Sequence, residues 1–162
     1  MLNRFLNIMN KIYKLPQRIK AKMVPLIHFL VSLLIAMLLY PIFSWKVLMV
    51  FAGGVLIDVD HYLLYICRFR KLSLKGCYKY HHVDVKKNHH KDVFGALLIF
   101  HTIEFLLLSA FLSLYSALAL IFTVGLLGHY TLDIIERYRL EKSFITNPSL
   151  IAWVVKNKIQ KA

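Results

Sequence analysis

Cysteine is scarce in this sequence, and its scarcity excludes some kinds of protein. Only Cys67 and Cys77 occur among 162 residues, so no disulfide framework is expected. Neither thiol has a paired base, and no serine arrangement typical of a nucleophile is present. Internal repeats, low-complexity linkers and a small-residue cleavage site before the first apolar run are also absent, so that run is expected to be retained.

Acidic residues are few as well, whereas apolar and basic residues are abundant. Eight Asp and Glu stand against 21 Lys and Arg, 59% of residues are hydrophobic, and the mean hydropathy is +0.59. An ordinary soluble domain is less apolar than this. A nucleic-acid binder would explain the charge but would not need apolar runs of about twenty residues. We therefore predict an all-α membrane protein whose basic loops contact anionic lipid headgroups, with no nucleic-acid partner.

Four apolar runs are predicted to cross the membrane as a helix bundle. They cover residues 24–43, 46–67, 93–115 and 117–136. Pro25 suits the first turn of the first helix, and Asp92 suits the cap of the third. Residues 23–136 are thus expected to form one four-helix transmembrane domain.

The segments that flank these runs are basic. They are the arm 1–22, with an amphipathic helix expected on the membrane surface or against the protein, the loop 68–92, and the tail 137–162. Within the tail, residues 150–155 are apolar but too short to span, and they are expected at the membrane surface. The turn between spans one and two carries only Lys46, and the turn between spans three and four carries no charge. By the positive-inside rule, this alternation predicts a multi-pass protein of the inner (cytoplasmic) membrane with both termini in the cytoplasm.

Ionisable side chains inside the predicted spans form the candidate site. Such residues are costly at membrane depth and usually mark function. The set consists of His28, Asp58, Asp60, His61, His101, Glu104, His129 and Asp133. At a rise of about 1.5 Å per residue, all of them lie in the cytoplasmic half of the bundle.

Helical spacing places three histidine–carboxylate pairs on common helix faces, because residues three or four apart lie on one side of a helix. These pairs are Asp58 with His61, His101 with Glu104, and His129 with Asp133. Asp60 lies off the shared face unless the helix is irregular after Gly53-Gly54. It is expected to act as a base or to orient a neighbouring ligand.

Histidine and carboxylate from several helices are the ligands with which helix bundles bind metal ions. Zinc is the expected ion, and manganese or iron would suit the same ligands. The predicted ligands are His28, Asp58, His61, His101, Glu104, His129 and Asp133. The simpler interpretation is a set of hydrogen-bonded pairs that lock the bundle, and it applies best to the lone His28. Asp58 and Asp60 favour a metal, because neighbouring buried carboxylates repel one another without a cation.

The loop 68–92 carries a second histidine-rich cluster. It contains His81, His82, Asp84, His89 and His90. Such a tract can bind metal, but a solvated basic loop that lies on lipid headgroups is the favoured interpretation. Four tyrosines near the predicted span ends are expected in an interfacial aromatic belt rather than in a catalytic role. They are Tyr62, Tyr65, Tyr130 and Tyr138.

Four elements of residues 24–136 match a known pattern. They are His28 early in the first helix, the Asp-x-Asp-His element Asp58–His61, a histidine in the next helix, here His101, and the late His-x-x-x-Asp element His129–Asp133. On these residues the sequence resembles the membrane-bound metal-dependent hydrolases, small inner-membrane proteins of bacteria and archaea. That family is similar to the fold of zinc-dependent phospholipase C and single-strand nuclease, which implies phosphoester substrates.

The chain departs from the family pattern at three places. Ile57 stands where proline usually precedes the first aspartate, and Gly128 stands where serine often precedes the late histidine. The usual Arg-Gly-x-Thr-His-Ser block is replaced by residues 100–105. The chain therefore resembles a divergent member, and the carried-over role of His101 and Glu104 is the weakest part of the comparison.

Three functions compete at this point. The favoured one is a metal-dependent hydrolase that acts on a phosphoester or lipid substrate at the cytoplasmic membrane face, with the metal activating water. The second is a cation or proton transporter. Four spans are few for transport unless the protein forms a homo-oligomer, and the outer half of the bundle offers little polarity beyond Ser32, Ser109 and Ser113. The third is a non-catalytic membrane protein with a structural polar cluster.

Overall fold

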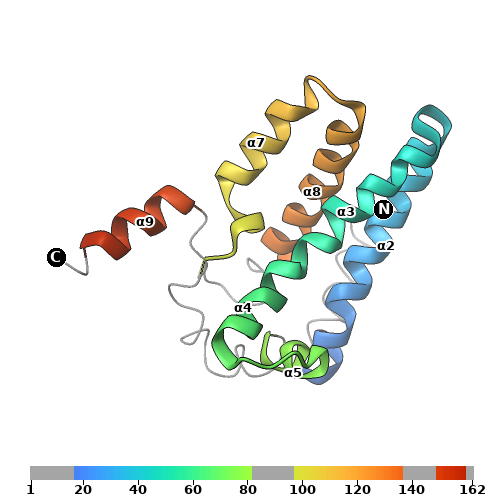
Figure 1. Cartoon of the computed structure of the whole chain (residues 1–162). Helices are drawn as coiled ribbons and strands as arrows, with labels where there is room; N and C mark the ends of the chain where they lie inside the picture. The colour runs from blue at the N-terminus through green and yellow to red at the C-terminus, as the bar shows by residue number, and fades with distance from the viewer. Residues whose placement is uncertain (1–16, 82–96, 137–148, 160–162) are drawn as a thin grey trace.

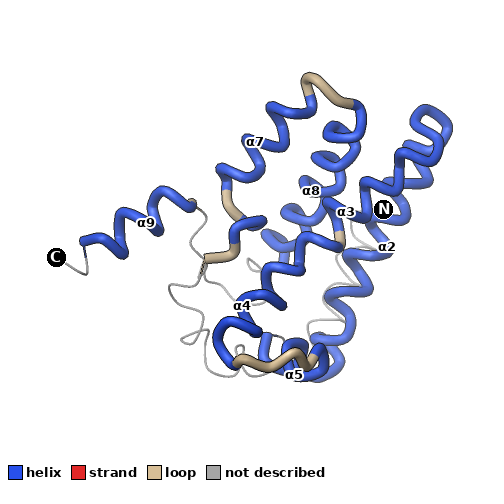
Figure 2. Tube along the Cα trace, viewed as in Figure 1, coloured by secondary structure: helices blue, strands red, loops and turns tan. Residues whose placement is uncertain are grey.

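The computed structural model describes residues 17–81, 97–136 and 149–159. Every regular element within these ranges is helical, which confirms the all-α prediction (Figure 2). The predicted N-terminal amphipathic helix and the Asp92 cap lie outside the described residues, as do Tyr138 and the loop residues His82, Asp84, His89 and His90.

Helix α2 (Gln17–Phe43) corresponds to the first predicted span and ends where expected. Its start differs, because Pro25 lies inside the helix rather than in its first turn. The chain then reverses through the 3₁₀ helix η1 (Ser44–Leu48), where Ser44 has φ 52°. After this turn, helix α3 (Met49–Gly54) runs back beside α2 (Figure 1).

The second predicted span is not one continuous helix. Helix α3 ends at Val55, which has φ −133° and ψ −48°, and the chain continues through η2 (Leu56–Asp58) into α4 (Val59–Phe69). Just before this break, α3 packs closely on α8 (Ala117–Glu136). A Cβ at Gly53 would overlap the carbonyl oxygen of Phe122, so only glycine permits this approach. The helix is thus irregular after Gly53-Gly54, which is the condition under which the sequence allowed Asp60 to reach the site.

The prediction of one continuous helix is also wrong for the third span. The described part consists of the 3₁₀ helix η5 (Ile99–His101), an extended Thr102, and α7 (Ile103–Ser113). The Thr102 hydroxyl accepts a hydrogen bond from the Phe105 amide at 3.4 Å and so caps α7. At about 1.5 Å per residue, α7 is about 16 Å long, which is short of a bilayer core of about 30 Å.

Helix α8 has the bounds of the fourth predicted span and is the centre of the packing. It contacts α2, α3 and α7. Ile121 and Leu126 on α8 are fully buried, and Val50 of α3 is buried against them. Two further helices lie outside this bundle. They are α5 (Leu74–Lys79), capped by Ser73, and α9 (Leu150–Ile159).

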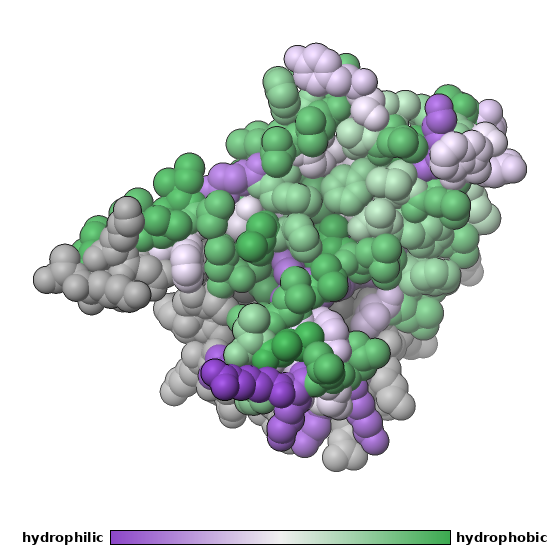
Figure 3. Space-filling view, in the orientation of Figure 1, coloured by the Kyte–Doolittle hydropathy of each residue, from purple (hydrophilic) through white to green (hydrophobic). Residues whose placement is uncertain are grey.

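Two helical stretches are long and apolar enough, by length and composition, to cross a membrane. They are Pro25–Phe69 and Ala117–Ile135. The first is not one rod, because the chain folds back at η1, and α2 is its long straight part (Figure 1). Apolar side chains cover most of the face formed by the bundle helices, and hydrophilic ones gather at the end that carries α5 (Figure 3).

Candidate metal centre

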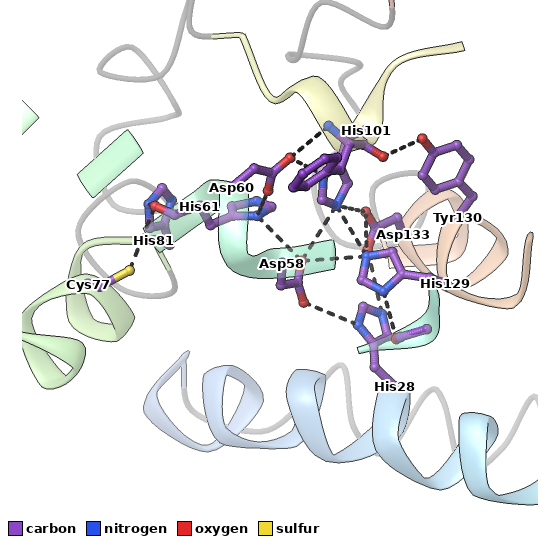
Figure 4. Close-up of polar contacts among 12 residues, drawn as sticks. His28, Asp58, Asp60, His61, Cys77, His81, His101, His129, Tyr130 and Asp133 are labelled. Carbon is purple, nitrogen blue, oxygen red and sulfur yellow. Dashed lines mark hydrogen bonds and ion pairs between the residues drawn. The ribbon is translucent and has the colours of Figure 1, made fainter. Parts of the chain in front are cut away.

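All but one of the predicted site residues meet between α2, α4, η5 and α8 (Figure 4). His28 comes from α2, and His101 is the last residue of η5. Asp58 ends η2, and Asp60 and His61 lie in the first turn of α4; His129 and Asp133 come from α8. The breaks at Val55 and Thr102 are what bring Asp58 and His101 to the same point.

Four side-chain atoms at the centre of this cluster lie 3.2–3.6 Å from one another in five of their six pairings. The Nε2 atoms of His101 and His129 are 3.2 Å apart. Each lies 3.5 Å from Asp58 Oδ1 and 3.6 Å from Asp133 Oδ2. These five distances suit a tetrahedral zinc site, because a regular tetrahedron with edges of this length has its centre about 2.0–2.2 Å from each corner, which is the bond length of zinc to nitrogen and oxygen ligands. We call these four residues the tetrahedral set.

The protonation of the two histidines also calls for a cation. The Nδ1 atom of His101 lies 2.9 Å from Asp60 Oδ2, and that of His129 lies 3.0 Å from the carbonyl oxygen of Gly54. A carboxylate and a carbonyl can only accept, so each Nδ1 carries the hydrogen. In neutral imidazoles both Nε2 lone pairs then face one another at 3.2 Å. A metal ion or a shared proton between them removes this conflict.

The partners of the two Nδ1 atoms follow from the local backbone. The carbonyl of Gly54 belongs to the last turn of α3, whose carbonyl groups have no partner within the helix. Asp60 is buried, and its Oδ2 accepts from the Phe100 amide at 3.2 Å as well as from His101. Its Oδ1 lies 3.0 Å from His61 Nδ1. Asp60 thus lies where it orients His101 and His61, which matches the orienting role expected for it rather than that of a base.

His28 and His61 extend the donor set on either side of Asp58. His28 Nε2 lies 3.5 Å from Asp133 Oδ1, and its buried Nδ1 has no hydrogen-bond partner. His61 Nδ1 lies 3.4 Å from Asp58 Oδ1. Among the described residues, three His/Asp triads have ligand atoms that all lie within 4.8 Å of one another. These are His28–Asp58–His129, Asp58–His61–His101 and His101–His129–Asp133.

Exposure within the tetrahedral set is uneven. The side chains of His129, His101 and Asp133 are 0%, 4% and 19% exposed, whereas that of Asp58 is 42% exposed. The cluster is therefore closed around α8 and η5 and open at Asp58. Among the described residues of the set, Asp58 gives a small molecule the most direct access.

Glu104 does not join the cluster, and its assignment as a ligand is a correction. The sequence argument assumed that His101 and Glu104 share one helix face, but the extended Thr102 between them breaks the helix. The Glu104 carboxylate instead accepts hydrogen bonds from the Ser149 hydroxyl at 2.6 Å and from the Leu150 amide at 2.9 Å. It therefore faces α9 and not the candidate metal.

Tyr130 was assigned to an aromatic belt, but it supports the centre. Its hydroxyl donates to the carbonyl of Phe100 at 2.6 Å and lies 3.2 Å from that of Thr102. Its ring stacks near that of His101, with centroids 6.1 Å apart. Tyr130 thus stabilises the irregular backbone segment that positions His101. No spacing in the sequence could have shown this, because the contact depends on the break itself.

One member of the loop cluster, His81, is described and lies beside the centre. Its Nε2 is 2.9 Å from the carbonyl oxygen of His61, and the two rings pack edge to face. Cys77 lies close by, with Sγ 3.8 Å from the same carbonyl oxygen. Burial raises the pKa of the Cys77 thiol, which keeps it protonated and makes it a poor ligand or nucleophile.

Comparison with protein-family models, with curated proteins and with solved structures finds no match. The resemblance to membrane-bound hydrolases therefore stays a prediction based on the motif residues alone. What the centre does has to be argued from its own geometry.

Proposed function

We propose that this protein is a membrane-embedded, metal-dependent hydrolase of phosphoesters, with zinc as the first candidate ion. The tetrahedral set is the observation that carries the proposal. It offers two nitrogen and two oxygen donors at zinc-like spacing, and its facing imidazole lone pairs need a cation. Both histidines donate their other nitrogen to an acceptor, as metal-bound histidines usually do.

Three members of the set suit permanent ligands. His101, His129 and Asp133 are the less exposed ones, whereas Asp58 is open to solvent. Catalytic zinc sites keep three protein ligands and leave the fourth position to water or substrate. In such a site His101, His129 and Asp133 would hold the ion, and the more exposed Asp58 carboxylate would be placed to accept a proton from a water bound at the fourth position.

The remaining residues suit an anionic substrate. A bound divalent ion supplies an acidified water and polarises a phosphoryl oxygen. His28 Nδ1 lies 4.0 Å from Asp58 Oδ2 and makes no hydrogen bond within the described part of the chain, so it can serve as a donor for a phosphoryl oxygen next to Asp58. Arg68, Lys71, Lys75 and Lys79 on and around α4 and α5 attract an anionic headgroup to the open side.

The membrane arrangement that we propose has four passes, with both termini in the cytoplasm. Helices α2 and α8 cross it, and the two broken segments complete the bundle. Irregular backbone within a membrane is tolerated only where protein covers it or where it lines a cavity. The breaks at Val55 and Thr102 meet this condition, because both lie at the metal centre. Broken helices commonly mark the binding sites of membrane proteins.

Cation transport is the second candidate, and one observation favours it. All four corners of the set are protein atoms, as in a site that holds an ion completely. A through-path is harder to find. Beyond the centre, a buried apolar cluster fills the space between α2, α3 and α8, where an ion would need a polar path. It consists of Ala36, Val47, Val50 and Ile121. Hydrolysis at the open side agrees better with this arrangement.

Elemental analysis of the detergent-purified protein tests the metal centre. Wild type is expected to hold a stoichiometric transition metal, and Asp133→Asn is expected to lose most of it because one corner no longer offers a charged ligand. Glu104→Gln is the matched control, since this carboxylate lies outside the cluster, and it should retain the metal. A wild type that binds no zinc, even when zinc is added, would refute the proposal.

Chemistry is tested next on the metal-loaded protein. Hydrolysis of phosphodiester and phosphomonoester lipids in mixed micelles is expected for wild type and not for Asp58→Asn. Zinc uptake into vesicles that carry the protein, without any hydrolysis, would favour transport instead.

A further inference from the structure

Helix α9 extends away from the bundle and is joined to it at its first turn (Figure 1). The joint is the Glu104 carboxylate. It accepts hydrogen bonds from the Ser149 hydroxyl at 2.6 Å, the Leu150 amide at 2.9 Å and the Ile151 amide at 3.2 Å. The Ser149 hydroxyl also accepts from the Ala152 amide at 3.1 Å. Three of the donors that begin α9 therefore turn toward one side chain of α7.

This joint is a charged helix cap supplied by another helix. The first amides of a helix lack partners within it, and a carboxylate there also interacts favourably with the helix dipole. Glu104 lies in the first turn of α7, so it fixes the starts of α7 and α9 against one another. The rest of α9 is then held out from the bundle in a defined direction.

The outer part of α9 exposes an apolar stripe. Ile151, Val155 and Ile159 are four residues apart along the helix, so they share one face, and they are 66%, 50% and 72% exposed. The same segment carries Lys156, Lys158 and Lys161 and no acidic residue. An exposed apolar stripe in a sequence segment that is rich in lysine and free of acidic residues is the pattern of a helix that lies in a membrane interface.

We propose that α9 is a docking helix for an anionic lipid surface, anchored to the protein by Glu104. This inference rests on the membrane embedding in the proposed function but not on the metal. With ten residues, α9 is about 15 Å long and too short to cross a bilayer core of about 30 Å. A short helix that exposes apolar and basic side chains is suited to lie at the boundary between lipid headgroups and acyl chains, where lysine can interact with anionic headgroups.

The position of the anchor gives the docking a consequence for the site. Glu104 follows His101 by three residues, and both flank the Thr102 break. When lipid holds α9, it restrains the start of α7 and therefore the segment that presents His101. Docking is expected to limit the motion of this segment without contributing a ligand, so Glu104→Gln should still retain the metal.

Tryptophan fluorescence tests the docking on the full chain. The protein has only Trp45 and Trp153, so Trp45→Phe leaves Trp153 of α9 as the single reporter. This protein is reconstituted in phosphatidylcholine vesicles with or without phosphatidylglycerol, using lipids brominated near the headgroup or near the chain end. Quenching by the shallow bromine is expected to exceed that by the deep bromine about twofold, and more so with phosphatidylglycerol.

Paired variants identify the surface and the anchor. Ile151→Ser with Ile159→Ser should abolish most of the shallow quenching, whereas Leu114→Ser, an equally exposed leucine at the far end of α7, should leave it unchanged. Glu104→Gln should speed hydrogen exchange of the Leu150 and Ile151 amides about fivefold, because the charged cap is lost. The metal content of the same samples is also measured, so a protein that binds no metal, which would refute the proposed function, is distinguished from one whose α9 does not dock.

Three results would overturn the inference. They are the absence of quenching from either depth, as for a helix in water or on a protein partner; stronger quenching by the deep bromine; and quenching that the double serine variant leaves intact.

Discussion

At the scale of single residues, the centre depends as much on side chains that support its ligands as on the ligands themselves. Asp60 accepts from both the His101 ring and the Phe100 amide, and Tyr130 donates to the Phe100 carbonyl on the other side of the same peptide segment. Two side chains from different helices thus hold one irregular turn. Such supporting partners commonly change metal affinity when they are removed.

Tyr130→Phe is expected to weaken zinc binding about tenfold, because it releases the turn that presents His101. It should also cost about 1–2 kcal/mol of unfolding free energy, since the carbonyl of Phe100 loses its hydrogen bond. Competition against a chelator of known affinity measures the first effect. Tyr62→Phe is the matched control, because its hydroxyl donates to the Leu72 carbonyl at 2.9 Å, away from the centre. Equal losses of zinc affinity in both variants would contradict a positioning role for Tyr130.

At the scale of the elements, glycine determines how closely α3 meets α8. A side chain at Gly53 would overlap the Phe122 carbonyl, and one at Gly125 would overlap the backbone of Val50. This close approach is what allows the Gly54 carbonyl to accept from His129. The helix contact and the ligand geometry therefore have one cause.

Gly53→Ala is expected to destabilise the protein by about 2–3 kcal/mol, because its new methyl group meets rigid backbone on α8. Gly128→Ala serves as the comparison. Its new methyl group would meet only the end of the Ile35 side chain, which can rotate, and alanine favours a helix over glycine by about 1 kcal/mol. Equilibrium unfolding in detergent should therefore separate the two variants clearly. An unaffected Gly53→Ala would mean that the helices are not in such close contact.

At the scale of the whole molecule, the candidate metal centre joins segments that are far apart in the chain. It draws on α2, the start of α4, η5 and α8, which otherwise meet through apolar side chains. Without a cation, the centre contains facing lone pairs and three neighbouring aspartates, Asp58, Asp60 and Asp133. A bound ion is therefore expected to stabilise the folded bundle in addition to its proposed role in hydrolysis.

Removal of the metal should lower stability. At a free zinc concentration about a hundred times the dissociation constant, binding contributes about 2.7 kcal/mol to the unfolding free energy. A strong chelator should therefore lower the thermal midpoint of wild type, and added zinc should restore it. Asp133→Asn, with one corner of the set changed, should respond to neither. A midpoint that is unaffected by chelator in wild type would indicate that a shared proton, and not a metal, lies between the histidines.

The sequence by itself determined the helical class, the bounds of α8, the end of α2 and nearly all residues of the cluster. These follow from hydropathy, from turn residues, and from the cost of placing ionisable side chains in apolar runs. Tertiary structure alone decided the breaks at Val55 and Thr102, the support from Tyr130, and the role of Glu104. Each of these depends on contacts between distant segments: glycines that admit a close helix, and backbone groups at helix ends that take side chains from elsewhere as partners. Helical periodicity assumes an unbroken helix, so it correctly paired His129 with Asp133 but wrongly paired His101 with Glu104.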